Sequence, residues 1–223
     1  MRQIIYVKYN RTRSEKFQLK TAIVRENGAL SVEKTALTEA GAGHMGSFWE
    51  KYQMIREQNP RIRFLEPEFK DGGKTVCFRY LEGETLADAL ADRIHMGQIP
   101  YEELERVMAL VFPEDFSVDS GHFSIKEQTG GPFAPSQGFT EVFGPVPEGL
   151  EELGRLTAAP NVDGLFENLM ISDGHVYGID YEWVFDMEIP AKFLHYRNLL
   201  YFYRRCEASV SSAQEELFAH FGI

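Results

Sequence analysis

The sequence contains little cysteine, no excess of positive charge and no long apolar run. Its two cysteines, Cys77 and Cys206, are too few for a disulfide scaffold or a cysteine-rich metal site. Lys and Arg number 23 against 34 Asp and Glu, and the resulting net charge of -11 argues against nonspecific nucleic-acid binding. No N-terminal signal region or membrane span is visible. These features predict a soluble, cytoplasmic protein that binds no nucleic acid.

Two further absences narrow the class of protein to which this sequence can belong. The six histidines show no metal-ligand spacing, and the chain has no internal repeat. With 223 residues, 43% of them hydrophobic, the chain is long enough to bury a substantial core, either as one domain or as two small lobes.

Three polar residues stand at spacings that suit a magnesium-dependent phosphoryl transferase. Asp163 and Asn168 lie five residues apart in a predicted loop, and Asp180 follows twelve residues later. Between them, an Asp-Gly turn at 173–174 separates two short apolar runs and predicts a β-hairpin. The hairpin would bring Asn168 and Asp180 to the same end, where they can share a metal.

The residue types fit this chemistry. Mg2+ prefers hard oxygen ligands, so a carboxylate and an amide oxygen would hold it and leave positions for phosphate and water. Asp163 then remains to orient the accepting hydroxyl and to act as its base.

The stretch resembles the catalytic loop and metal-binding Asp of the protein-kinase-like superfamily, in its aminoglycoside-phosphotransferase and lipopolysaccharide-kinase branches. The family pattern is His-x-Asp-x-x-x-x-Asn, then a hairpin and an Asp. Asn161 stands where the family usually has His, and Tyr181 and Glu182 follow Asp180 where many kinases have Phe-Gly. The resemblance implies that Asn168 and Asp180 hold Mg2+, with a lower-ranked contact from Glu182.

The resemblance also implies the fold, an α+β, bilobal protein-kinase-like fold that uses ATP and Mg2+. Residues 1–82 would form an N-lobe with an antiparallel sheet plus a helix, and residues 83–223 a reduced, mainly helical C-lobe. Apolar or alternating runs predict five strands in the N-lobe. They are 3–9, 17–24, 30–37, 61–68 and 74–80.

Lys34 is the candidate for the lysine that contacts the donor phosphates. It lies in the third predicted strand, which resembles the Val-Ala-Ile-Lys strand of kinases. An ammonium there would offset phosphate charge that otherwise repels the nucleophile. Lys20 is the rival position, and a solvated strand lysine is the alternative.

Glu50 is the candidate partner of that lysine. Apolar residues at three- and four-residue steps predict a helix over 44–56, and Glu50 sits beside its apolar face. From there it would reach Lys34 and orient it. Glu39 and Glu57 compete for this role.

The loop expected to cover the phosphates is atypical, because residues 10–16 contain no glycine. A Gly-rich loop lets backbone N–H groups approach phosphates, so side chains would have to replace them here. Arg11 and Arg13 are the candidates, through bidentate contacts. A solvated basic turn is the alternative.

The run from Tyr80 to Gly83 resembles the hinge of small-molecule kinases. Backbone groups of Tyr80, Leu81 and Glu82 would then bind the adenine edge, whereas the alternative is a strand end capped by glycine. Thr85 is a candidate N-cap for a helix over 86–95.

Gly and Pro recur between residues 113 and 160, where the pattern is irregular. No long apolar helix precedes the catalytic loop, and 148–156 offers only a short substitute. Phe139, Val142 and Phe143 argue against disorder, so the segment is a candidate for acceptor recognition. A loosely packed linker is the alternative.

The run 180–185, followed by Ile-Pro and an aromatic helix at 191–205, looks like the kinase domain of O-antigen kinase/methyltransferase enzymes. We therefore expect an ATP-dependent kinase acting on a hydroxyl of a small molecule or glycan in lipopolysaccharide biosynthesis, associated with polysaccharide-biosynthesis enzymes. The glycine-free loop and Asn161 favour the alternative of a pseudokinase, a nucleotide-binding or interaction module without transfer activity. A non-nucleotide scaffold, a protein hydroxyl as acceptor, and AMP transfer stay open.

Overall fold

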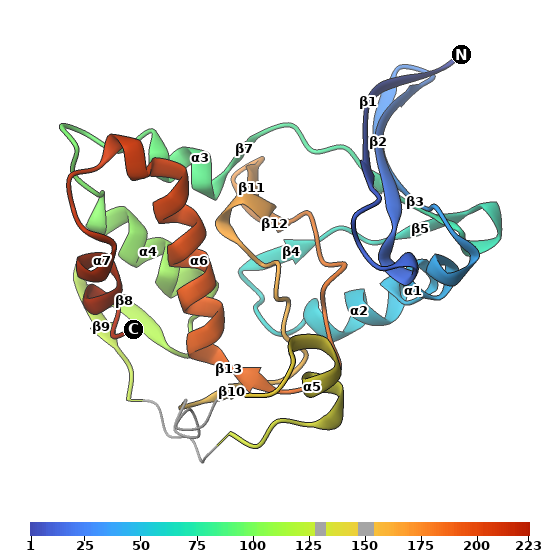
Figure 1. Cartoon of the computed structure of the whole chain (residues 1–223). Coiled ribbons are helices and arrows are strands. Elements are labelled where there is room, and N and C mark those ends of the chain that lie inside the picture. The colour runs from blue at the N-terminus through green and yellow to red at the C-terminus, as the bar shows by residue number, and fades with distance from the viewer. Residues whose placement is uncertain (128–132, 147–153) are drawn as a thin grey trace. The chain divides into compact units, whose positions relative to one another are not determined.

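The computed structural model describes residues 1–127, 133–146 and 154–223, and its elements are labelled in Figure 1. These residues form two compact units. The first comprises Met1–Glu57 and Arg63–Glu82, and the second comprises Gln58–Ile62 and Gly83–Ile223. The fold class is α+β, with an antiparallel sheet in the N-terminal unit.

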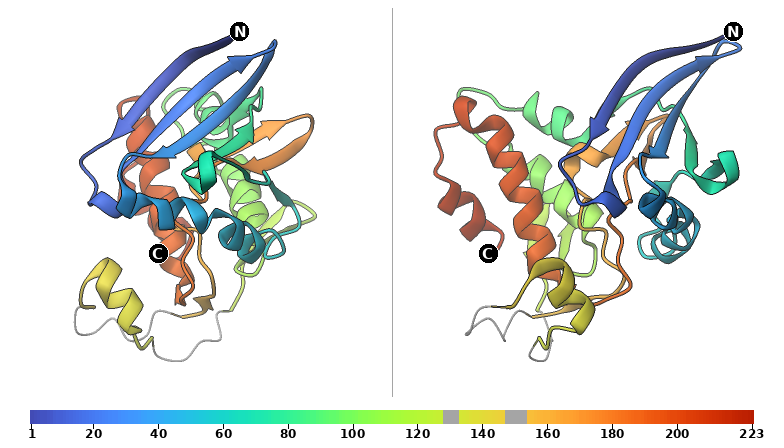
Figure 2. Two further views of the ribbon diagram at one scale, coloured as in Figure 1. Left: turned by 90° about the vertical axis from the view of Figure 1, so that its right-hand side faces the viewer. Right: turned by 45° about the vertical axis from the view of Figure 1, so that its right-hand side comes forward.

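The first unit is built on a five-stranded antiparallel sheet with the strand order β1-β2-β3-β6-β5. The strands are β1 (Arg2–Asn10), β2 (Leu19–Glu26), β3 (Ala29–Ala36), β5 (Glu68–Lys70) and β6 (Thr75–Arg79). Both views of Figure 2 show β1, β2 and β3 running side by side as long blue strands. The Asn27–Gly28 turn between β2 and β3 has positive φ at both residues, as expected for a tight hairpin.

The predicted strand at 61–68 is two short strands, β4 (Ile62–Phe64) and β5. Pro67 lies between them, and a proline lacks the N–H that a continuous ladder needs. The other four predicted strands of this region are present, with bounds that differ by a few residues.

The predicted helix at 44–56 is interrupted. The structure has α1 (Ala42–Gly46) and α2 (Phe48–Ile55), separated at Ser47, whose hydroxyl donates to the carbonyl of His44. Such local side-chain bonds compete with regular helix geometry. The Phe48 ring lies 5.9 Å from that of Phe78 on β6, so α2 covers the face of the sheet that carries Phe78.

The second unit contains α3 (Leu86–Ala91), α4 (Tyr101–Val111), α5 (Gln137–Phe143), α6 (Ala191–Cys206) and α7 (Gln214–His220). Side chains from α4, α6 and α7 fill its core and are almost fully buried: Leu104, Met108, Leu199, Phe202 and Leu217. Thr85 is the N-cap of α3, as predicted, and its hydroxyl accepts from the backbone N–H of Asp88. The helix ends at Ala91, earlier than expected.

A hairpin in the second unit joins β11 (Leu169–Ser172) to β12 (His175–Gly178) through the Asp173–Gly174 turn. Both turn residues have positive φ, which the Asp-Gly pair tolerates. The short strand β7 (Glu84–Thr85) pairs with the other edge of β11. The hairpin predicted from the sequence is therefore confirmed.

The segment predicted to be irregular contains regular structure. A hairpin of β8 (Phe116–Asp119) and β9 (His122–Ile125) turns at Ser120–Gly121, and β10 (Leu156–Thr157) pairs with β13 (Ile189–Pro190). Of the short helix expected at 148–156, residues 148–153 lie outside the described residues. In the described part, Leu156 belongs to a strand, so no helix is found there.

Single 3-10 turns complete the described secondary structure: Glu15–Phe17, Glu39–Gly41, Asp71–Gly73, Phe166–Asn168 and Glu207–Ser209. No helix in the described ranges combines the length and apolar character needed to cross a bilayer.

Candidate functional site

The loop that carries Asp163 is bound to the segment that carries Asp180. The side-chain amide Nδ2 of Asn161 donates to the carbonyl of Asp180 at 3.1 Å. The backbone N–H of Val162 donates to the carbonyl of Trp183 at 3.1 Å. Asn161, which stands where the resembled family has His, therefore ties the two segments together.

Asn168 occupies the other end of this loop, next to Asp180. Its carbonyl accepts from the N–H of Ile179 at 3.0 Å, which continues the hairpin pairing beyond β11 and β12. Its side-chain Nδ2 donates to the carbonyl of Asp163 at 2.9 Å. Because the nitrogen is used in this way, the amide orientation is fixed and Oδ1 remains available to act as a ligand.

The donor set fits a hard cation. It consists of Oδ1 of Asn168 and the carboxylate of Asp180, whose Oδ1 also accepts from the N–H of Glu182 at 3.3 Å. Amide and carboxylate oxygens are the ligands that Mg2+ takes. Glu182 is buried. Within the described part of the chain, no group of three or more His, Cys, Asp or Glu side chains is placed to hold a metal.

Asp163 is held by an arginine from α6. Nη2 of Arg197 lies 3.0 Å from Oδ1 of Asp163, and Nε donates to the carbonyl of Val162 at 3.1 Å. The next residue on the helix, Asn198, donates through Nδ2 to the carbonyl of Gly164 at 3.3 Å. Two consecutive α6 residues thus fix three consecutive residues of the loop.

The sequence prediction did not include Arg197 or Asn198. The one signal for them is that they are polar residues within an aromatic-rich helix. Asn198 is almost fully buried, and asparagine is a poor helix former. An asparagine in such a place is retained for a hydrogen bond and not for packing.

Aromatic side chains surround the Arg197 guanidinium. Its Cζ lies 5.3 Å from the ring centre of Tyr201 and 5.8 Å from that of Phe193, one helical turn to either side. Phe193 in turn lies 6.0 Å from Phe143 of α5. The predicted acceptor segment therefore reaches the surroundings of Asp163 through its aromatic residues.

In the first unit, Lys34 is buried and lies on the sheet face that α2 covers. It pairs across the sheet with Val76. Two residues along β3, Val32 lies opposite Phe78, so these side chains share a face. Lys20 pairs with Thr35 and thus lies on the opposite face. Of the two rival lysines, Lys34 is the one beneath the helix.

The structure does not bring Glu50 to Lys34. Glu50 is exposed, and it forms no hydrogen bond or ion pair with any described residue, whereas Lys51 is the charged residue on the buried face of α2. Because the helix breaks at Ser47, α2 begins anew at Phe48, and its buried face carries Phe48, Lys51 and Ile55. Glu50 lies outside this buried face and is exposed. The competing acids also pair elsewhere: Glu39 with Lys74 at 2.6 Å, and Glu57 with Arg56 at 3.1 Å.

A glutamine holds the glycine-free loop. Nε2 of Gln18 donates to the carbonyls of Arg11 at 3.2 Å and Arg13 at 2.9 Å. The exposed Arg11 guanidinium stacks over the Tyr9 ring at 5.0 Å. The loop is therefore shaped by a side chain and keeps its arginines at the surface of the unit.

Near the predicted hinge, a pocket of about 380 Å3 is lined by Arg25, Gly28, Leu30, Tyr80 and Glu82. The N–H of Tyr80 is already used, because it donates to the carbonyl of Leu30 at 3.2 Å. An adenine edge would thus rely on the backbone of Leu81 and Glu82. Leu81 itself is buried.

Gly83 follows this run, and a close contact with β11 of the second unit requires a glycine at this position. Its φ is +155°, and a Cβ built there would lie 2.0 Å from the carbonyl oxygen of Ile171 on β11. Only glycine permits this close backbone approach.

Comparisons with known proteins give distant likenesses only. No family model and no curated protein matches the chain. Among solved structures, macrolide 2'-phosphotransferase MphH from Brachybacterium faecium aligns with 97% of this chain and 77% of its own, at 12% identity and a TM-score of 0.41. A thermostable mutant of aminoglycoside phosphotransferase APH(4)-Ia, in complex with AMP-PNP and hygromycin B, aligns over 98% and 84%, at 12% identity and 0.40. The GDP and kanamycin complex of APH(2")-IIia aligns over 99% and 78%, at 12% identity and 0.42. Because these identities and TM-scores are low, the activity proposed below rests on the residues of this chain and not on these likenesses.

Proposed function

We propose that this protein is an ATP- and Mg2+-dependent phosphotransferase that acts on a hydroxyl of a small molecule or glycan. The pair of asparagine hydrogen bonds carries the proposal. Asn168 bonds to the carbonyl of Asp163, and Asn161 bonds to the carbonyl of Asp180. Together they join the hydroxyl-positioning residue and the metal-binding residues into one cluster within the second unit.

Each residue of the cluster has a role. Asp163 accepts a hydrogen bond from the acceptor hydroxyl and takes its proton as the phosphoryl group arrives. Asn168 and Asp180 would hold Mg2+, with Glu182 as a lower-ranked contact, and the ion when bound offsets the charge of the donor phosphates. Arg197 positions Asp163 and keeps a positive charge beside its carboxylate.

Groups of the first unit would serve the nucleotide. Lys34 is assigned to the donor phosphates, with Arg11 and Arg13 as further phosphate contacts in place of a Gly-rich loop. Leu81 and Glu82 would offer their backbone to the adenine edge. Glu50 has no role in this assignment, because it is exposed whereas Lys34 is buried.

A glycan hydroxyl is the favoured acceptor. The resemblance of residues 180–185 to O-antigen kinase/methyltransferase enzymes supports it, and the reaction would then belong to lipopolysaccharide biosynthesis. The aromatic residues of α5 that pack near Phe193 would lie on the acceptor side of Asp163.

The test compares two asparagine variants of the same hairpin. Phosphate release from Mg-ATP and phosphate transfer to a panel of mono- and oligosaccharides are measured for the wild type, Asp180→Asn and Asp173→Asn. Asp180→Asn should lower transfer by at least about 10²-fold, because a charged metal ligand is lost. Asp173 lies in the exposed turn, so its variant should retain wild-type transfer and unfold at the same temperature. Full transfer by Asp180→Asn would overturn the metal assignment.

A pseudokinase is the second candidate, favoured by the outward position of Glu50 and by the glycine-free loop. Thermal shift with ATP, with and without Mg2+, separates the two. A shift without transfer to any acceptor would support the pseudokinase. If no shift occurs under either condition, both nucleotide proposals fail and a scaffold role remains.

A further inference from the structure

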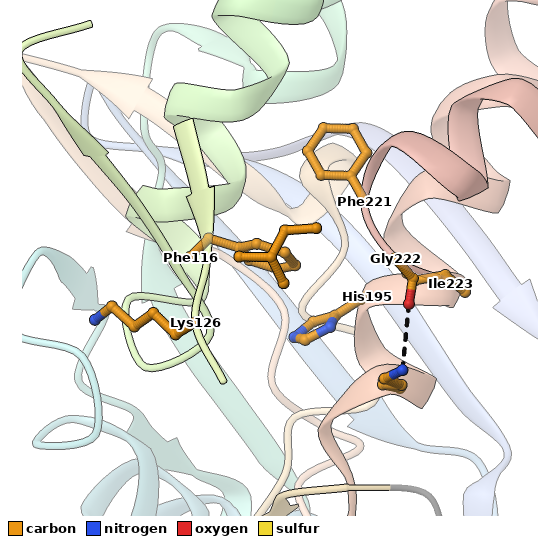
Figure 3. A pocket seen from close by; sticks show the side chains of 8 residues that line it. Phe116, Lys126, His195, Phe221, Gly222 and Ile223 are labelled. Atoms are coloured by element: carbon orange, nitrogen blue, oxygen red, sulfur yellow. Dashed lines mark hydrogen bonds between the residues drawn. The ribbon is translucent and has the colours of Figure 1, made fainter. Parts of the chain in front are cut away.

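A pocket of about 180 Å3 lies within the second unit and shares no residue with the loop that carries Asp163. Figure 3 shows its lining, which comes from the β8–β9 hairpin, from α6 and from residues 221–223. Phe116 and Phe221 form buried apolar walls, and His195 lines it from α6. An apolar cavity of about 150 Å3 binds benzene, so this volume suits one six-membered ring.

His195 is held by a buried carboxylate. Its Nε2 lies 3.0 Å from Oδ2 of Asp115, a residue with no exposed surface. The same carboxylate accepts from Nε and Nη2 of Arg155 at 2.8 and 2.6 Å. The rings of Phe112 and Phe116 lie 4.6 and 4.8 Å from the imidazole and fix its plane.

The protonation state follows from these contacts. Burial by itself would raise the pKa of Asp115, but the hydrogen bonds from Arg155 and His195 outweigh it and lower the pKa to about 2. Burial lowers the pKa of His195, although the bond to Asp115 opposes this. At neutral pH the carboxylate is therefore ionised and the imidazole neutral. Because a carboxylate only accepts, the imidazole proton resides on Nε2, and Nδ1 carries the lone pair.

That lone pair is unused. Nε2 of His195 is used by Asp115, and Nδ1 forms no hydrogen bond with any residue in the described ranges. The pocket that this ring lines is the place from which a donor can reach it.

Two lysines line the pocket and differ in direction. Lys192 extends its Nζ to the carbonyl of Gly222 at 3.2 Å, and an ammonium has three donors, so others remain for a ligand. Lys126 donates to the carbonyl of Pro113 at 2.6 Å. In Figure 3 its ammonium points away from His195, so it contributes its aliphatic stem.

We propose that this pocket binds a single-ring aromatic molecule, or an apolar molecule of that size, which donates a hydroxyl or N–H to Nδ1 of His195 and presents an anionic group to Lys192. The apolar walls favour an aromatic ring. Nδ1 of His195 favours a ligand with a hydrogen-bond donor, and Lys192 favours a ligand with an anionic group. The site is independent of the phosphotransferase proposal.

The test uses matched probes on the full chain. Binding of 3- and 4-hydroxybenzoate is measured by calorimetry, beside 4-methoxybenzoate, which lacks the donor, and phenol, which lacks the anion. At least one hydroxybenzoate should bind and shift the His195 Nδ1 resonance in 15N NMR. The methoxy compound should bind about 10-fold more weakly, because Nδ1 then has no partner. Absence of binding by both hydroxybenzoates, or equal binding of the methoxy compound, overturns the proposal.

Two variants of α6 test the charge. Lys192→Met should weaken hydroxybenzoate binding about 10-fold and leave phenol binding unchanged. Arg204→Met, an exposed residue of the same helix that does not line the pocket, is the matched control and should bind all probes like the wild type. Lys192 and Arg204 are both exposed, so both variants should fold. Equal losses in the two variants would contradict the assigned role of Lys192.

Discussion

Nη2 of Arg197 lies 3.0 Å from Oδ1 of Asp163, although 33 residues separate them along the chain. The guanidinium also binds the carbonyl of Val162, so one side chain holds both the backbone and the carboxylate of the loop. A planar guanidinium can do this because its N–H groups point in fixed directions. The helix that follows Asp180 in the chain thereby orients the residue assigned to the acceptor hydroxyl.

Replacing Arg197 should impair transfer. In Arg197→Met the carboxylate of Asp163 loses its orienting bond, and misplacement of a catalytic group by about 1 Å costs on the order of 10²-fold in rate. Arg197→Lys should recover only part of the loss, since one ammonium cannot span both partners. The kcat of phosphate transfer is the readout, with ATP affinity expected to stay unchanged.

The control for this prediction is Arg205→Met on the same helix, which removes an exposed pair with Asp88. Exposed pairs contribute little, so its kcat should equal that of the wild type. An Arg197→Met variant with a kcat within twofold of wild type would refute the positioning role.

Asn161 should be replaceable by histidine but not by leucine. Its amide N–H bonds to the carbonyl of Asp180, and an imidazole N–H can donate to the same atom, whereas leucine cannot. Asn161→Leu should raise the Mg2+ concentration needed for half-maximal transfer and lower stability by about 1 kcal/mol. Asn161→His should resemble the wild type in both. Equal Mg2+ requirements for the leucine and histidine variants would argue against a tether.

Gly83→Ala should destabilise the fold by at least about 1–3 kcal/mol. The residue combines a φ of +155° with a Cβ position 2.0 Å from a backbone oxygen, and backbone strain of this kind alone costs that amount. Gly174→Ala is the control, because φ there is +72° and no atom lies within 4 Å of the added Cβ. Urea unfolding should give a much lower free energy of unfolding for Gly83→Ala than for Gly174→Ala. A reversed ranking would mean that the contact with Ile171 is relieved at little cost.

Stability should fall in acid through Asp115. Its pKa is lowered from 3.8 to about 2 in the folded state, so the unfolded chain binds the proton more readily. The stabilisation, about 2 kcal/mol, is then fully present above pH 4 and is lost as the pH falls toward 2. Urea unfolding of wild type and Asp115→Asn between pH 2 and 6 should show a smaller acid loss in the variant. If Asp115→Asn does not fold, Arg155→Met should lose part of the same acid dependence.

Several local features could be predicted because they depend on neighbours in sequence. Alternating residues predicted most strands of the N-terminal sheet. The Asp173–Gly174 turn predicted the hairpin, and Thr85 predicted the start of a helix. The β8–β9 hairpin was missed, since its Ser-Gly turn stands among many other Gly and Pro signals. The phase of α2 was also missed, because a break at one residue decides which side chains face the sheet.

By itself the sequence determined most strands of the N-terminal sheet, the start of α3, and the spacing that brings Asn168 and Asp180 to one end of a hairpin. These follow from turn chemistry and from periodicity over a few residues. Only the tertiary structure decided that Arg197 holds Asp163, that Lys34 rather than Lys20 lies beneath α2, and that His195 meets Asp115. Those contacts join residues far apart in the chain, and packing of whole elements, not local preference, brings them together.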